Sequence, residues 1–168
     1  MVSGSVGCHG AAVLMARGEI PFAGELLSDC RPLHQLSAAA LEAGGVRILR
    51  DPTRGGVATT LNEFVEGSAL TIELEEDAIP VDPAVAAACD LLGLDPLYSA
   101  CEGRMLAVVS PGQADAVLDA LHQTSGGEHA AMIGRVTESR PGHVVLRTAL
   151  GGSRILGKLT GVQLPRIC

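Results

Sequence analysis

The sequence predicts an α/β protein in which helices pack on a mixed β-sheet. Segments with helical spacing of apolar residues alternate with short strand-like segments along most of the 168 residues. The last strand-like segments follow one another with no helix between them, which indicates antiparallel pairing beside the strand–helix–strand units. Apolar residues make up 47% of the chain, enough to form a sizeable core in one domain of this length.

Apolar periodicity and the residues that begin or end helices define the expected elements. Leu33 and Leu36 start a helical pattern that Gly44 ends, and Asp82 followed by Pro83 is typical of a helix start. A glycine pair at 151–152 indicates the turn of a closing hairpin. In chain order, we expect helices at 11–17, 32–43, 57–65, 83–92 and 113–122, and strands at 46–49, 70–74, 105–109, 132–136, 144–148 and 154–156.

The chain is expected to form one domain followed by a short tail. We predict a domain over residues 1–156 and an extended tail over 157–168 that carries Cys168. The mean hydropathy is +0.32, yet apolar stretches such as 105–109 are far shorter than the ~18 residues needed to span a membrane. The N-terminus shows no pattern of an export signal, so we expect a soluble cytoplasmic protein with no membrane partner.

Charge and aromatic content argue against nucleic-acid binding. The chain has 12 Lys and Arg residues against 19 Asp and Glu residues, a formal net charge of −7 with neutral His. Its aromatic residues are Phe22, Phe64 and Tyr98, so a nucleic acid would find neither a basic surface nor stacking platforms. The five cysteines form no CxxC pair and no zinc-type spacing with histidines, so we expect no metal site.

A glycine-containing loop at 50–56, Arg-Asp-Pro-Thr-Arg-Gly-Gly, lies between an expected strand and an expected helix. Glycines allow backbone N–H groups to approach a phosphate, a helix N-terminus favours anions, and Arg50 or Arg54 can pair with phosphate oxygens. The loop matches neither the Walker A nor the dinucleotide-binding spacing. A tight turn capped by Asp51 or Thr53 explains the same residues equally well.

The last residue, Cys168, is a candidate carrier of a covalently attached group. Pro165 stiffens the residues before it, and nothing follows the thiol that would obstruct its entry into another protein's site. The alternative is an incidental thiol on an unstructured chain end, which composition alone favours.

Glu102 is a candidate general base. It precedes the apolar strand at 105–109. Partial desolvation at the end of a buried strand can raise the pKa of a carboxylate, so that it acts as a general base near neutral pH. The alternative is a surface glutamate paired with Arg104, which the residues alone favour somewhat.

The remaining polar features favour structural interpretations. Cys8 and His9 at the start of the first helix could form an activated thiol, but a helix cap and a buried small residue are the stronger interpretation. The acidic run at 73–77 is expected to face solvent.

Five short segments together resemble a known family. They read Ser-Gly-Ser-Val-Gly-Cys-His-Gly at 3–10, Arg-Asp-Pro-Thr-Arg-Gly-Gly at 50–56, Leu-Leu-Gly-Leu-Asp at 91–95, Cys-Glu-Gly at 101–103 and Pro-Arg-Ile-Cys at 165–168. The combination closely resembles the C-terminal half of the hydrogenase maturation proteins HypE. The loop at 50–56 is shared with the wider superfamily of aminoimidazole ribonucleotide synthetase and selenophosphate synthetase, whereas the C-terminal segment is highly specific.

The resemblance implies the C-terminal-domain fold of aminoimidazole ribonucleotide synthetase and a carbamoyl dehydratase activity. In that family the terminal thiol receives a carbamoyl group from the carbamoyltransferase HypF, ATP activates the carboxamide, and loss of phosphate leaves a thiocyanate. The cyanide then passes to iron held by the scaffold proteins HypC and HypD. The implied site residues are Cys168 as carrier, Glu102 as the proton-handling carboxylate, and the ATP loop Asp51, Thr53, Arg54, Gly55 and Gly56.

Two departures from the family accompany the resemblance. Members usually have Asp at the position of Cys8. The family's N-terminal domain, which holds the acidic ligands of Mg²⁺-ATP and forms the homodimer, is absent from this chain. A non-catalytic domain that presents its tail to partners, or a phosphoryl-transfer enzyme without cysteine chemistry, therefore remains an alternative function.

Overall fold

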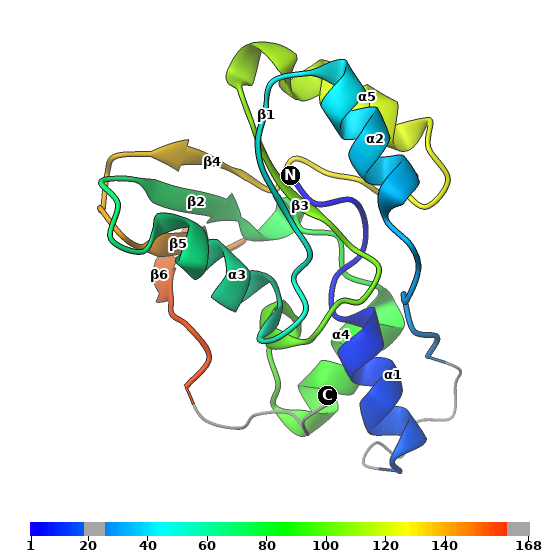
Figure 1. Ribbon diagram of the computed structural model, residues 1–168. Helices are drawn as coiled ribbons and strands as arrows, with labels where there is room; N and C mark the ends of the chain where they lie inside the picture. Colours follow the sequence, from blue (N-terminus) through cyan, green and yellow to red (C-terminus); the bar gives the residue numbers. More distant parts are fainter. Residues whose placement is uncertain (19–25, 161–168) are drawn as a thin grey trace.

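Five α-helices surround two β-sheets in the computed structural model, which describes residues 1–18 and 26–160 (Figure 1). The helices are α1 (Cys8–Ala16), α2 (His34–Ala43), α3 (Gly56–Val65), α4 (Pro83–Leu92) and α5 (Ala114–His122). The strands are β1 (Val46–Arg50), β2 (Thr71–Glu75), β3 (Leu106–Val109), β4 (Gly134–Thr137), β5 (Val144–Arg147) and β6 (Ser153–Leu156). Short 3₁₀ turns lie at η1 (Glu76–Ala78), η2 (Pro96–Tyr98) and η3 (Pro111–Gln113). Each expected helix and strand is present within a few residues of its expected bounds.

The larger sheet is mixed, as expected. Its order is β4-β2-β5-β6, with β2 parallel to β5 and the other pairs antiparallel. The strands β1 and β3 form a separate antiparallel pair, so the strands do not all join one sheet. Val2 at the N-terminus lies between the two sheets, because it bridges Leu106 of β3 on one side and Ala131, just before β4, on the other.

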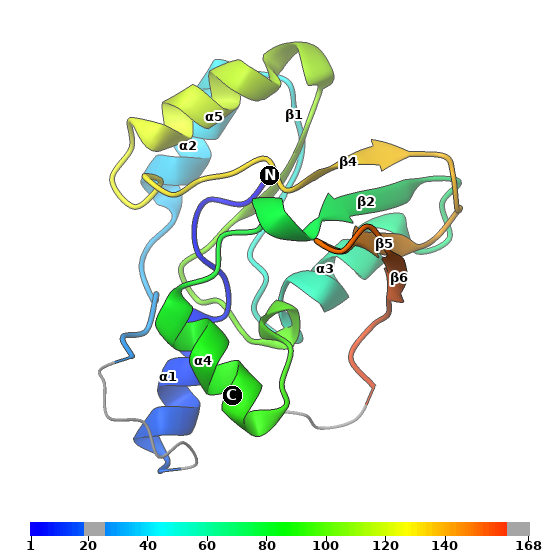
Figure 2. The same ribbon diagram turned by 180° about the vertical axis from the view of Figure 1, so that it is seen from behind.

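Three apolar clusters hold these layers together. The largest lies between α3 and the larger sheet and includes Val57, Leu146 and Leu156, all fully buried. A second cluster lies between α1 and α4. The third joins α2 and α5, which run side by side over the β1–β3 pair in both views (Figures 1 and 2). The candidate residues Asp51 to Gly55 and Glu102 lie in the segments between β1 and α3 and between η2 and β3.

The start of α4 confirms its predicted signal. The Asp82 Oδ1 atom accepts a hydrogen bond of 2.8 Å from the Ala84 N–H, and Pro83 occupies the first helical position. This cap satisfies one of the N–H groups that have no acceptor within a helix.

The expectation that the acidic run at 73–77 faces solvent is wrong for Glu73. Its side chain is only 9% exposed, and its carboxylate accepts hydrogen bonds from four side chains of β4, the turn after it and β5: Arg135, Thr137, Ser139 and Arg147. These bonds, led by those from Ser139 and Arg135, lower the pKa of Glu73 to about 2. Glu75, Glu76 and Asp77 are exposed.

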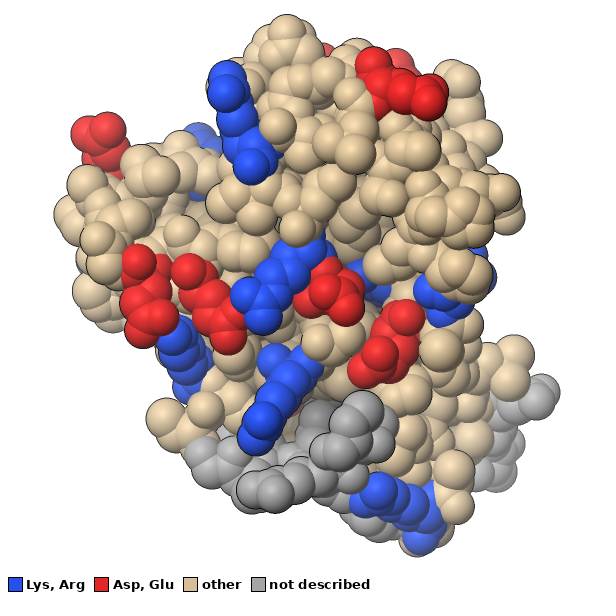
Figure 3. All heavy atoms as spheres, viewed as in Figure 1, with Lys and Arg blue, Asp and Glu red and all other residues tan. Residues whose placement is uncertain are grey.

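Charged side chains of both signs are interspersed on the face shown in Figure 3 rather than collected in one area of a single sign. Among residues 1–18 and 26–160, no helix is long and apolar enough to cross a membrane.

Candidate functional site

The loop at 51–56 forms a tight turn into α3. The Gly56 N–H donates to the Thr53 carbonyl at 3.2 Å, and Gly55 and Gly56 adopt left-handed φ values of 75° and 62°. The expected cap by Asp51 or Thr53 is wrong, because Gly55 occupies the cap position and no side chain caps this helix. A Cβ at Gly56 would lie 2.5 Å from the Leu97 carbonyl oxygen, so close packing against η2 by itself requires glycine here.

The two arginines of this loop differ in their surroundings. Arg50 forms an ion pair with Glu63 of α3 and is therefore already engaged. Arg54 is exposed and makes no ion pair with any residue that the structure describes. Arg54 is accordingly the loop's arginine that has no ion-pair partner among the described residues.

The structure brings Glu102 next to this loop. The N–H of Cys101, the preceding residue, donates to the Pro52 carbonyl at 3.1 Å. The Sγ of Cys101 accepts the Gly7 N–H at 3.2 Å, and burial raises the pKa of its thiol to about 12. The Cys101 thiol is therefore unreactive at neutral pH. The hydrogen bonds of Cys101 connect the N-terminal segment and the glycine loop to the residue before Glu102.

Asp29, which sequence reasoning missed, contacts the residues on either side of Gly103. Its Oδ1 atom accepts the Glu102 N–H at 3.2 Å, and its Oδ2 atom lies 3.6 Å from the Arg104 Nε. Arg104 also donates to the Ser5 carbonyl at 2.9 Å. The proposed pairing of Glu102 with Arg104 is thus replaced by one between Asp29 and Arg104.

Cys8 and His9 begin α1 beside this cluster. Burial, together with the negative charge of Asp29, raises the pKa of the Cys8 thiol, which is the opposite of an activated nucleophile. The His9 Nδ1 atom is 2.8 Å from the Ser28 Oγ. No side chain caps α1, so the cap interpretation fails as well, while partial burial of Cys8 fits the packing interpretation.

The residues after β6 run back to α3 and η2. The Tyr98 hydroxyl donates to the Gly157 carbonyl at 2.9 Å, the Lys158 Nζ lies 2.6 Å from the Glu66 carboxylate, and the Leu159 N–H donates to the Thr59 Oγ1 at 3.2 Å. Thr59 lies in the first turns of α3, directly after the glycine loop. Cys168 lies outside the described residues.

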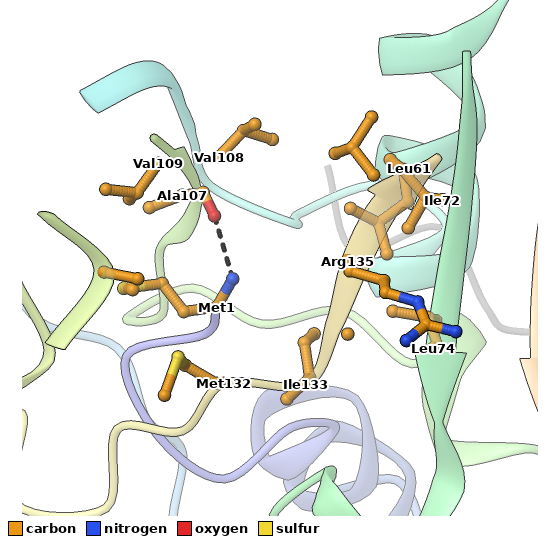
Figure 4. Close-up of a pocket in the computed structure, with 13 residues that line it drawn as sticks. Met1, Leu61, Ile72, Leu74, Ala107, Val108, Val109, Met132, Ile133 and Arg135 are labelled. Carbon is orange, nitrogen blue, oxygen red and sulfur yellow. Dashed lines mark hydrogen bonds between the residues drawn. The ribbon is translucent and has the colours of Figure 1, made fainter. Parts of the chain in front are cut away.

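The apolar hollow in Figure 4 is separate from these residues. It has a volume of about 100 Å³ and is lined by Met1, β3, β2 and the segment through β4, with none of the candidate residues in its wall. The Met1 amine donates to the Ala107 carbonyl at 2.8 Å, and burial lowers the pKa of the amine to about 6. Nowhere in the described ranges do three or more His, Cys, Asp or Glu side chains gather in a way that could hold a metal ion.

The family model of the AIR synthase related protein, C-terminal domain, matches residues 1–147, and the chain belongs to this family. Within it, the chain resembles the hydrogenase maturation proteins HypE. It is 49% identical to the carbamoyl dehydratase HypE of Rhizobium leguminosarum bv. viciae, over all of this chain and 49% of the relative.

Solved structures agree with this resemblance. A crystal structure of HypE in complex with ATP has a TM-score of 0.91 and 44% identity, and the match covers 99% of this chain and 51% of that chain. A crystal structure of a HypE–HypF complex has a TM-score of 0.89 and 37% identity, covering 94% of this chain and 52% of that chain. This chain thus spans about half the length of the relatives it matches.

Proposed function

We propose that this chain supplies the C-terminal half of a carbamoyl dehydratase that serves nickel-iron hydrogenase maturation in the cytoplasm. The observation that carries the proposal is the 49% identity to a carbamoyl dehydratase along the whole chain. The hydrogen bond from Cys101 to Pro52, which brings Glu102 to the glycine loop, supports it. In this proposal residues 1–156 are the domain and residues 157–168 are the tail that presents Cys168.

The proposed reaction removes one water from a carboxamide carried on sulfur. The thiol of Cys168 first accepts a carbamoyl group from HypF. The carboxamide oxygen then accepts the γ-phosphoryl group of ATP, and ADP is released. Phosphorylation is needed because an amide oxygen is otherwise a poor leaving group. The nitrogen loses its two protons, the C–O bond breaks with release of phosphate, and a C≡N bond forms. Glu102 accepts one of these protons, and the other leaves on the released phosphate.

The described residues fit a phosphate group better than they fit Mg²⁺. The exposed guanidinium of Arg54 provides donors for phosphate oxygens, in line with the prediction for the loop from Asp51 to Gly56. Among the described residues, no group of three or more His, Cys, Asp or Glu side chains could hold a metal ion. We assign the Mg²⁺ ligands to the half that precedes this chain in the family, and no step here depends on them.

The partners follow from the same proposal. HypF, which forms a complex with a relative 37% identical to this chain, delivers the carbamoyl group. HypC and HypD hold the iron that accepts the cyanide, and a homodimer forms through the half that precedes this chain in the family.

A chimaera tests the proposal: this chain replaces the matching half of the R. leguminosarum HypE, and the product is incubated with HypF, carbamoyl phosphate and ATP. Mass spectrometry of the C-terminal peptide should show a carbamoyl adduct that loses the mass of one water. Cys168→Ser should abolish the adduct, and Glu102→Gln should keep it but slow the loss of water to a small residual rate that long incubation can still measure. Cys30→Ser, which changes an exposed thiol, is the matched control. An adduct that persists in Cys168→Ser would refute the carrier role.

A further inference from the structure

Asp29 is a buried carboxylate that touches three consecutive residues, Glu102 to Arg104. Its side chain is 1% exposed. The Oδ1 atom accepts the Glu102 N–H, Oδ2 faces the Arg104 guanidinium, and a Cβ at Gly103 would collide with the Asp29 carbonyl oxygen. The backbone of residues 102–104 therefore packs closely against Asp29, with no room for a side chain at Gly103.

The hydrogen bonding of Asp29 is incomplete. Its Oδ2 atom has no hydrogen-bond partner within the described part of the chain, and the same is true of the nearby His9 Nε2. Arg104 at 3.6 Å supplies charge but no hydrogen bond. A buried carboxylate oxygen without a hydrogen bond is costly, so stability alone does not account for an aspartate at this place.

Glu102 is held from both sides by these contacts. On one side, Cys101 is bonded to Pro52 of the glycine loop and to Gly7. On the other side, Asp29 holds the Glu102 N–H and, through Arg104, the Ser5 carbonyl. The backbone of Glu102 is thus held at two points, by the contacts of Cys101 on one side and by Asp29 on the other. These contacts set the position from which the Glu102 side chain extends.

We propose that Asp29 is a positioning residue that fixes the backbone of Glu102 so that its carboxylate meets the carboxamide on Cys168. This inference rests on the proposed function, in which Glu102 accepts the proton. Asp29 acts through Glu102 and touches no substrate. Misplacement of a catalytic group by about 1 Å can slow a reaction by about 100-fold, so loss of the Oδ1 contact should slow dehydration by about 10- to 100-fold.

A double-mutant cycle in the chimaera tests this. The carbamoylated protein is mixed with saturating ATP, and its conversion to thiocyanate is followed by mass spectrometry for the parent, Asp29→Ala, Glu102→Gln and the double variant. We expect Asp29→Ala to slow dehydration while carbamoyl transfer and the KM for ATP stay within about twofold of the parent. In the Glu102→Gln background, Asp29→Ala should add no further loss.

Asp29→Asn keeps an acceptor for the Glu102 N–H and should recover most of the rate lost in Asp29→Ala. The same cycle is run with Asp29→Ser, whose shorter side chain loses the contact with the Glu102 N–H, if Asp29→Ala does not fold, with a thermal melt as the check and the exposed Asp119→Ala as control. Equal, additive losses in both backgrounds, or an equal loss of transfer and dehydration, would overturn the positioning role. An unchanged rate in Glu102→Gln alone would instead refute the proposed base.

Discussion

Two buried carboxylates, Glu73 and Asp29, have opposite surroundings. Glu73 on the larger sheet accepts hydrogen bonds from four side chains, which hold its pKa at about 2. Asp29 accepts one backbone N–H and has an oxygen without a hydrogen bond from any described residue. A buried carboxylate with all its hydrogen bonds stabilises a fold. A buried carboxylate with incomplete hydrogen bonding costs stability, so its presence needs an explanation other than stability. The comparison suggests that the sheet carries stability and the Asp29 region carries alignment.

The first prediction concerns the core beneath the sheet, where the effect on stability should be largest. Leu146 of β5 is fully buried in the main cluster, so Leu146→Ala should lower the free energy of unfolding by about 2–5 kcal/mol. Urea denaturation measures this change. Leu150→Ala, at a side chain that is 99% exposed, is the matched control. Similar midpoints for the two variants would show that the sheet does not dominate stability.

A second substitution probes the Asp29 region and should cost less. Gly103→Ala places a Cβ against the Asp29 carbonyl oxygen, and overpacking of this kind costs about 1–3 kcal/mol. Gly112→Ala, whose added Cβ meets nothing within 4 Å, should leave the urea midpoint nearly unchanged. If Gly103→Ala matched Gly112→Ala, the close packing of Asp29 on Glu102 and Arg104 would be wrong.

The smallest effect is expected from the pH dependence of the Glu73 network. Its folded pKa of about 2 lies below the ordinary value of 4.5, so its contribution is complete above about pH 4.5 and is lost as the pH falls toward 2. Glu73→Gln should therefore lower Tm at pH 7, and its difference from the parent should shrink in acid. Glu75→Gln, at an exposed carboxylate, is the control. A difference that stayed constant from pH 7 to pH 2 would contradict the ionised network.

The sequence predicted local features well because their signals are local. Asp82 and Pro83 begin α4, and the glycine pair at 151–152 lies in the turn between β5 and β6, as expected. The misjudged residues depend on distant partners. Glu73 is bonded to side chains more than 60 positions away, and Asp29 meets Glu102 across 73 positions. No periodicity or spacing records such a contact, because it exists only once the layers have packed.

Of the candidate site, the sequence indicated Glu102 and the glycine loop but not what joins them. The link is a backbone hydrogen bond between Cys101 and Pro52, to which side-chain identity contributes nothing. The glycines at 55 and 56 showed that the turn is tight, yet the close approach of η2 that makes Gly56 necessary could not be foreseen. Cys168 stays a prediction.

The hydrogen bond between Leu159 and Thr59 sets an upper bound on the distance from α3 to the Cys168 thiol. Cys168 lies nine positions after Leu159, and a fully extended chain covers at most about 3.3–3.6 Å per position, or roughly 30 Å in total. The Cys168 sulfur therefore lies within about that distance of the first turns of α3 while the hydrogen bond of Leu159 is in place. Under the proposed function, an enzyme that loads or unloads this thiol must bring its own reacting atoms within the same distance of α3.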